Sequence, residues 1–154
     1  MKQYHLNKLS PELGAEIGGI DLSKDFNEEI QNKIYDDLIN YKVLFFREQN
    51  ITPQFHVEFA KSFGSIEEPH PVYPHVEGFP EIVLLENDKD NPPDTDEWHT
   101  DVTFKNDPPF ASVLYSKTIP EVGGDTLWSS LSKIYDALPH ELKAQIENLR
   151  AIHD

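Results

Sequence analysis

The chain has 154 residues, the usual size of one domain, and 38% apolar with 11% aromatic residues is enough to build a packed core. Thirteen lysines and arginines against 28 aspartates and glutamates give a formal net charge of -15, which repels phosphate backbones and anionic lipid surfaces. We therefore expect neither a nucleic-acid nor a membrane partner. Because cysteine is absent, disulfides, thiolate metal sites and a thiol nucleophile are excluded, and any metal must use histidine and carboxylate ligands.

The chain start lacks the long apolar stretch of a secretory signal. The longest apolar runs, at residues 43–46 and 82–85, are far too short to span a bilayer. We expect a soluble, cytoplasmic protein with a single domain over residues 1–154.

The first predicted helix starts after Asn27. Two glutamates occupy its first turn, where the helix dipole favours acids, and its apolar residues recur at helical spacing: Ile30, Ile34, Leu38 and Tyr41. Residues 43–46 follow as a run without polar alternation, which predicts a strand covered on both faces.

A second helix is predicted from Thr52 as N-cap and Pro53 as the first helical residue. Its apolar face comprises Phe55, Phe59, Ala60 and Phe63, and Gly64 ends it. Both helices are most simply scaffold.

Beyond residue 69 the sequence changes to short strand-like pieces between clusters of Pro, Gly, Asn and Asp: residues 82–85, 98–104, 111–116 and 126–128. Residues 86–97 and 121–125 read as loops. A last helical region is predicted with Ser132 as cap and a buried stripe of Leu142, Ile146 and Leu149. The pattern indicates an α+β protein with a sheet core.

The most informative pair is His99 and Asp101. On a strand, residues two apart project on the same face, so an imidazole and a carboxylate could reach one ion together. Such a pair is two-thirds of the 2-His-1-carboxylate site of non-haem iron(II) oxygenases. The spacing alone is weak evidence, because a histidine and an aspartate on an edge strand can simply pair with their neighbours. Trp98 and Phe104 bracket the pair and could form a dry wall, although such aromatics are more often core.

Four motifs occur in order along the chain: HPVYPH at residues 70–75, NPPD at 91–94, WHTDVTF at 98–104 and GGDTLW at 123–128. Together with the segments 14–19 and 43–47, they closely resemble the taurine dioxygenase family, the iron(II)- and 2-oxoglutarate-dependent oxygenases of the TauD/TfdA type. The likeness extends through essentially the whole chain.

The resemblance implies that His99 and Asp101 are the first two iron ligands and that the Thr126 hydroxyl donates to a carboxylate of 2-oxoglutarate. It also implies a substrate wall made by His70, Tyr73 and the backbone at Val102. Without the family, the favoured interpretation of His70 and Tyr73 is that they cap their own proline-rich turn.

One position departs from the family pattern. Thr95 stands where taurine dioxygenases usually carry an asparagine that contacts the substrate amine, and a threonine hydroxyl lacks the separate acceptor and donor of an amide. This puts taurine itself in doubt, and other sulfonates or a sulfate ester become reasonable substrates.

The fold implied is the double-stranded β-helix, a jelly-roll with peripheral helices, of which this chain would form an incomplete barrel. Family members are roughly twice as long, and their second half supplies the third iron ligand and the arginines for 2-oxoglutarate and sulfonate. We therefore expect the N-terminal half of an enzyme, inactive alone, that uses Fe(II), 2-oxoglutarate and O2 to release sulfite and an aldehyde from a small sulfonate.

Two other readings stay open. One is a different family enzyme, acting on alkyl sulfate esters or aryloxyacids, which would keep His99, Asp101 and Thr126 and change the wall. The other is a jelly-roll binding module without catalysis, since two protein ligands hold labile iron(II) weakly. A homo-oligomer is compatible with either, and the residues do not determine the oligomeric state.

Overall fold

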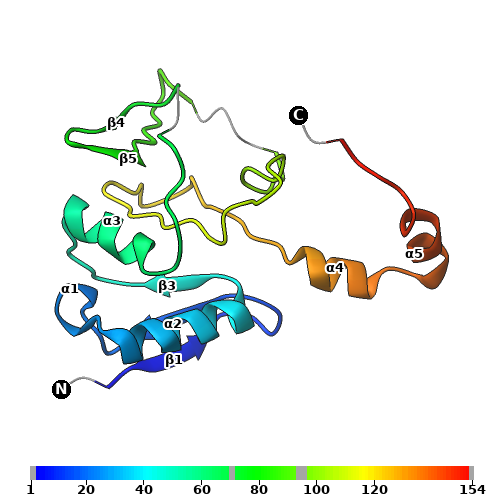
Figure 1. Cartoon of the computed structure of the whole chain (residues 1–154), viewed down its shortest axis with the longest axis horizontal. Coiled ribbons are helices and arrows are strands. Elements are labelled where there is room, and N and C mark those ends of the chain that lie inside the picture. Colours follow the sequence, from blue (N-terminus) through cyan, green and yellow to red (C-terminus); the bar gives the residue numbers. More distant parts are fainter. Residues whose placement is uncertain (1–2, 70–71, 93–96, 153–154) are drawn as a thin grey trace. The chain divides into compact units, whose positions relative to one another are not determined.

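The computed structural model describes residues 3–69, 72–92 and 97–152 (Figure 1). Its contacts divide the chain into two compact units, the first formed around residues 1–50 and 116–151 and the second around residues 51–115. The predicted single domain over residues 1–154 stays a prediction.

The sheet of the first unit has three strands in the order β1-β2-β3: His5–Lys8, Ala15–Gly18 and Leu44–Phe46. β1 and β2 form an antiparallel pair, and β2 pairs in parallel with β3, with Ala15 opposite Leu44. Ala15 and Ile17 are buried. The strand expected at residues 43–46 is confirmed as β3, but its side chains are half-buried, so the expectation that both faces are covered is wrong.

Helix α2 (Glu28–Tyr41) packs beside β3 and confirms the first predicted helix. Asn27 is the N-cap of this helix, and its side chain accepts a hydrogen bond from the backbone N–H of Ile30. Of the predicted stripe, Ile34 is buried, with 3% of its surface exposed. The helix therefore presents its apolar face to the unit's interior.

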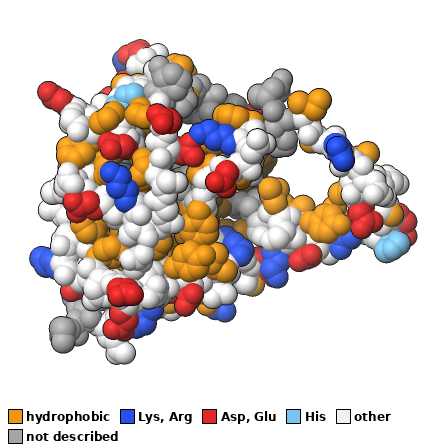
Figure 2. Space-filling model, in the orientation of Figure 1, with side chains coloured by type: hydrophobic (Ala, Val, Ile, Leu, Met, Phe, Trp, Pro, Cys, Tyr) orange, Lys and Arg blue, Asp and Glu red, His pale blue; other side chains and the backbone are white. Residues whose placement is uncertain are grey.

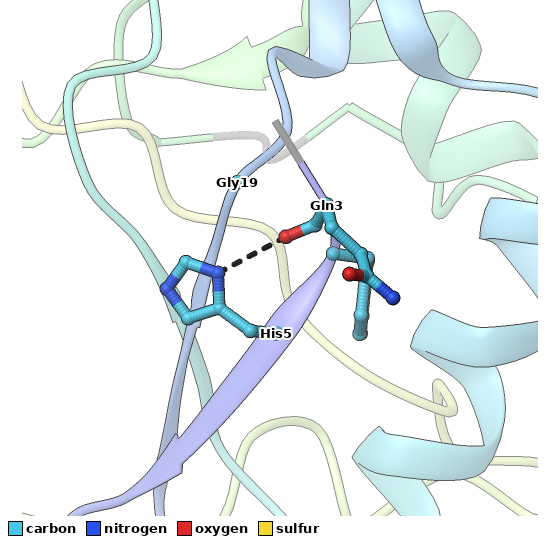
Figure 3. A pocket seen from close by; sticks show the side chains of 4 residues that line it. Gln3, His5 and Gly19 are labelled. Atoms are coloured by element: carbon cyan, nitrogen blue, oxygen red, sulfur yellow. Dashed lines mark hydrogen bonds between the residues drawn. The ribbon is translucent and has the colours of Figure 1, made fainter. Parts of the chain in front are cut away.

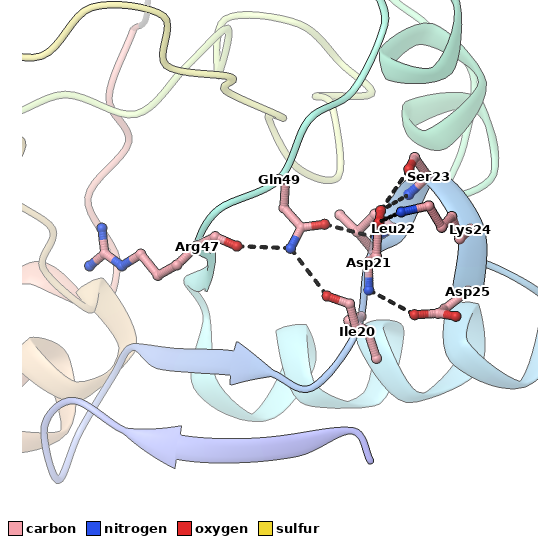
Figure 4. A network of polar contacts seen from close by, with 8 residues as sticks. All are labelled: Ile20, Asp21, Leu22, Ser23, Lys24, Asp25, Arg47 and Gln49. Atoms are coloured by element: carbon pink, nitrogen blue, oxygen red, sulfur yellow. Dashed lines mark hydrogen bonds and ion pairs between the residues drawn. The ribbon is translucent and has the colours of Figure 1, made fainter. Parts of the chain in front are cut away.

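The short helix α1 (Leu22–Asp25) is tied to the end of β3 by Gln49 (Figure 4). Gln49 Oε1 accepts from the backbone N–H of Leu22 at 2.8 Å, and Nε2 donates to the carbonyls of Ile20 and Arg47 at 3.2 and 2.8 Å. The hydrogen bond from Lys24 holds the pKa of Asp21, the N-cap, below its ordinary value. This network connects the segment that follows β2 with the segment that follows β3.

Gly19 follows β2 in a conformation that only glycine accommodates there. Its φ is 79°, and an added Cβ would lie 2.0 Å from the Gln3 carbonyl oxygen, which accepts from His5 Nδ1 at 3.1 Å (Figure 3). Gly19 therefore has a steric reason in the fold.

The second unit is built on helix α3 (Pro53–Lys61) and a hairpin of β4 (His75–Val76) with β5 (Phe79–Val83). Thr52 Oγ1 accepts from the Phe55 backbone N–H at 3.1 Å, so the predicted N-cap is confirmed. Val57 and Phe59 are buried, and α3 packs against β5. The strand expected at residues 82–85 is confirmed in part, since β5 ends at Val83.

The strands predicted at residues 98–104, 111–116 and 126–128 are wrong. These segments are turns and irregular chain, and their large apolar side chains are exposed, Trp98 by 70% and Phe104 by 62%. A strand needs a neighbour for its backbone N–H and C=O groups, and within the described ranges these segments have none. The expected dry wall of Trp98 and Phe104 is absent for the same reason.

The last predicted helical region forms α4 (Leu131–Ala137) and α5 (His140–Ile146). The N-cap of α4 is Ser130, whose Oγ accepts from Lys133 N, so the prediction of Ser132 as cap is wrong. The predicted stripe is not buried: Leu142 is 41% and Leu149 70% exposed, and Figure 2 shows hydrophobic side chains at the surface of this region.

The described residues are of the α+β class and include no closed barrel, so the jelly-roll stays a prediction. None of the helices within these residues is long and apolar enough to cross a membrane.

Candidate metal centre

His99 and Asp101 face each other in the second unit, although they lie before and within a turn rather than on a strand. Nε2 of His99 is 3.4 Å from Oδ1 of Asp101, and the two side chains are 56% and 58% exposed. The turn does what the predicted strand was expected to do. It brings one imidazole nitrogen and one carboxylate oxygen to the same place.

The outer atom of each side chain has its own partner. His99 Nδ1 lies 2.9 Å from the carbonyl oxygen of Glu97, and Ser112 Oγ donates to Asp101 Oδ2 at 3.1 Å. When Nδ1 carries the proton and donates to Glu97, the lone pair of the ring is on Nε2, facing Asp101. His99 Nε2 and Asp101 Oδ1 thus face each other and could both reach one ion placed beside them.

Val102 gives the turn its shape. Its φ of 54° is unusual for a β-branched residue, and its carbonyl accepts from the Lys105 backbone N–H at 3.2 Å. Lys105 also forms a short ion pair with Glu67, which holds the turn to the segment that follows α3. Val102 itself is half-buried.

The donor set fits iron(II) or another divalent first-row metal, since imidazole nitrogen and carboxylate oxygen are ligands that such ions accept. Within the described ranges, no three histidine or acidic side chains gather in a way that could hold a metal ion. The predicted ligands His99 and Asp101 would supply two donors, and a firm metal site would need a further ligand.

Thr126 belongs to the first unit, whereas His99 and Asp101 belong to the second. It is exposed on irregular chain after Gly123 and Gly124, which both have positive φ and lie in the loop predicted at residues 121–125. Two residues further on, the ring of Trp128 packs against Phe45 of β3. The role of Thr126 toward 2-oxoglutarate stays a prediction.

Of the four residues predicted to contact substrate, the structure describes two. Tyr73 is half-buried just before β4, and Val102 follows Asp101, both in the second unit. His70 and Thr95 lie outside the described residues. The wall therefore stays a prediction from the family resemblance.

The loop that precedes the site begins with a tight turn. Asp88 Oδ1 accepts from the backbone N–H groups of Asp90 and Asn91 at 2.7 and 2.8 Å. The hydrogen bond from Asn91, and to a lesser extent that from Asp90, holds the pKa of Asp88 below its ordinary value. The turn lies within the loop predicted at residues 86–97 and leads into the NPPD motif.

Sequence reasoning missed Ser112 and the Glu97 carbonyl. Ser112 is one of two serines in an apolar, strand-like segment and belongs to no motif, and a backbone carbonyl leaves no sequence signal at all. Both were found through their hydrogen bonds to the predicted ligands.

The chain is similar to known proteins along almost all of its length. A model of the family described as taurine catabolism dioxygenase TauD, TfdA family, matches residues 5–154. An alkylsulfatase of Acinetobacter baylyi is 40% identical over 153 residues, covering 99% of this chain and 47% of the relative. An alpha-ketoglutarate-dependent sulfate ester dioxygenase of Pseudomonas putida is 37% identical over 154 residues, covering 98% of this chain and 50% of the relative.

Among solved structures, a taurine dioxygenase from Burkholderia xenovorans matches with a TM-score of 0.83 and 38% identity, over 97% of this chain and 53% of that chain. The chain thus spans about half the length of the relatives it matches.

Proposed function

Since the chain belongs to the TauD/TfdA family of dioxygenases, we propose that it is the N-terminal part of an Fe(II)- and 2-oxoglutarate-dependent enzyme. In this proposal the enzyme oxidises the carbon that carries the sulfur group of a small sulfonate or sulfate ester. The longer protein would act in the cytoplasm, and its further part would supply the third metal ligand and complete a jelly-roll barrel.

The observation that carries the proposal is the arrangement of His99 and Asp101. Their inner atoms are 3.4 Å apart, while Glu97 and Ser112 occupy their outer atoms. Metal-binding histidines typically donate their second ring N–H to a carbonyl or carboxylate in this way.

Bound iron(II) with 2-oxoglutarate and O2 would supply the oxidation of a C–H bond, with succinate and CO2 as products from 2-oxoglutarate. The residues of this chain have simpler tasks. His99 and Asp101 hold the metal through one atom each and leave positions open for the other reactants. Thr126 would donate its hydroxyl proton to a 2-oxoglutarate carboxylate, and Tyr73 with the backbone at Val102 would orient the substrate.

The half-length match and the exposed apolar side chains support a longer protein. Most of the exposed large apolar side chains follow residue 97, including Leu114, Ile119 and Leu131. Side chains of this size are stabilised when they are removed from water, and further chain packed against them would bury them. The intact mass of the purified natural protein tests this part of the proposal.

Two substrate classes are supported by different relatives. The matched structure is named a taurine dioxygenase, whereas the two curated relatives are named an alkylsulfatase and a sulfate ester dioxygenase. Thr95, which replaces the usual asparagine near the substrate amine, favours a substrate without an amine. The sulfate ester is therefore the specific second candidate beside a sulfonate.

The products distinguish these possibilities. Oxidation of a sulfonate at the carbon bearing sulfur releases sulfite and an aldehyde, whereas oxidation of an alkyl sulfate releases sulfate and an aldehyde. Full-length protein with Fe(II), 2-oxoglutarate and each substrate should form succinate in equal amount to the aldehyde. If neither substrate class increases O2 consumption or succinate formation and the protein binds no divalent metal, the proposal is wrong and a non-catalytic binding module is favoured.

A further inference from the structure

We propose that Ser112 is a positioning residue that holds Asp101 in the orientation needed for metal binding through one oxygen. The proposal rests on the proposed function, because it assigns His99 and Asp101 to a metal. It adds a residue to which neither the family motifs nor the sequence pattern gives a role.

The argument begins with the two oxygens of Asp101. Oδ2 accepts from Ser112 Oγ at 3.1 Å, and Oδ1 faces His99 Nε2 at 3.4 Å. A free carboxylate can rotate or bind a cation through both oxygens at once. The serine hydroxyl favours the rotamer in which Oδ1 alone is directed to the shared point, which would keep a coordination position open.

Ser112 can do this because its segment is attached to the core of the same unit. The neighbouring carbonyl, that of Val113, lies 2.9 Å from Nε2 of His56, and the His56 ring lies edge-on to Tyr115 at 6.3 Å. His56 is on α3, directly before Val57, and the buried side chains of Val57 and Phe59 anchor this helix. A short series of contacts therefore runs from α3 through the 112–115 segment to Asp101.

An exposed hydrogen bond contributes little to stability, so the effect should appear at the metal and not in folding. Asp101 is 58% exposed and the serine is exposed as well, so Ser112→Ala should leave the fold unchanged. Loss of an outer partner of a metal ligand typically weakens metal affinity by about 10- to 100-fold.

The test measures Co2+ binding to full-length protein by equilibrium dialysis and records the visible absorption of the bound Co2+. We expect Ser112→Ala to bind Co2+ about tenfold more weakly, at the lower end of the range for such partners. Its absorption spectrum should change because the carboxylate is free to bind through both oxygens. Ser112→Thr, which keeps a hydroxyl, should restore both properties, and Ser65→Ala should match the wild type.

Each outcome supports or overturns the proposal. If the wild type binds Co2+ and Ser112→Ala matches it in affinity and spectrum, Ser112 has no positioning role and the proposed function stands. If threonine fails to rescue while the protein melts normally, the hydroxyl is not the active group and the proposal is again overturned. If the wild type and Ser65→Ala both fail to bind Co2+, the metal site itself is absent and the proposed function fails with it.

Discussion

The ring of Trp128 meets the ring of Phe45 edge to face, with centroids 5.2 Å apart and planes at 83°. The centroid of the Phe45 ring also lies 5.4 Å from the guanidinium carbon of Arg47. Arg47 Nε in turn forms an ion pair with Glu16 Oε2 of β2 at 3.1 Å. The contact fastens the irregular segment that carries Thr126 to strand β3. The predicted 2-oxoglutarate residue thus depends on an aromatic pair for its position.

Trp128→Ala should therefore weaken 2-oxoglutarate binding in the full-length protein. An edge-to-face pair contributes about 0.5–1.5 kcal/mol beyond area burial, and its loss would free the segment. We expect the apparent KM for 2-oxoglutarate to rise roughly two- to tenfold, measured from succinate formation. Leu127→Ala, at a side chain that is 70% exposed, is the control. Equal changes in the two variants would show that the aromatic contact does not position Thr126.

His99→Ala and Asp101→Ala should each abolish iron-dependent activity and leave the fold largely intact, because both side chains are more than half exposed. Metal affinity should fall at least as far as the roughly 10- to 100-fold seen when outer partners are lost. Titration with Fe(II) under anaerobic conditions measures it. His140→Ala, an exposed histidine at the start of α5, should bind iron normally. Near-normal iron binding by either site variant would contradict the assignment of these ligands.

Thr95→Asn should lower the apparent KM for taurine in the full-length protein. The substitution supplies an amide oxygen to the substrate ammonium, and one better hydrogen bond is worth about 1 kcal/mol, or roughly five- to tenfold in affinity. Initial rates of sulfite release with taurine and with an amine-free alkanesulfonate provide the comparison. The same change for both substrates would mean that position 95 does not contact the amine.

Val102→Asn should stabilise the turn that carries Asp101. A left-handed φ costs a β-branched residue about 1–2 kcal/mol, and asparagine adopts this region more readily. With φ at 54°, we expect a gain of about 1 kcal/mol in the free energy of unfolding by urea titration. Val122→Asn, at an exposed valine without positive φ, should show no such gain. A loss of stability in Val102→Asn would show that valine packing outweighs backbone strain.

Tyr4 should make folding stability sensitive to high pH. Burial, together with its 2.6 Å hydrogen bond to Asp37 on α2, raises the pKa of Tyr4 above its ordinary value of 10.0. The folded protein therefore keeps the phenolic proton where the unfolded chain loses it. This contribution is fully present below about pH 10 and is lost as the pH rises toward the folded-state pKa.

Tyr4→Phe removes the hydroxyl and should cost about 1 kcal/mol near neutral pH. The decline in stability above pH 10 should then be shallower than in the wild type, as followed by urea unfolding at several pH values. Tyr135→Phe, at an exposed tyrosine of α4, should keep the wild-type slope. A wild-type slope in Tyr4→Phe would show that another group causes the alkaline loss.

The first two predicted helices could be located from the sequence because short-range chemistry decides them. Thr52 caps its helix as predicted, and Ile34 is buried on the predicted face, whereas the predicted cap Ser132 is replaced by Ser130. Caps and helical periodicity depend on residues within one or two turns, so neighbouring residues carry the whole signal. The approach of the His99 and Asp101 side chains was also predicted, although from a strand that does not form, and a turn brings them together instead.

The tertiary structure decided whether a strand-like segment becomes a strand. Residues 98–104 and 111–116 have the composition of strands, yet their backbones find no strand neighbours among the described residues. Strand pairing joins segments distant in sequence, and composition does not specify the partner. The contact of Ser112 with Asp101 was likewise decided by the fold, because the two residues are 11 positions apart and meet only through the turn at Val102 and the anchoring of the 112–115 segment to α3.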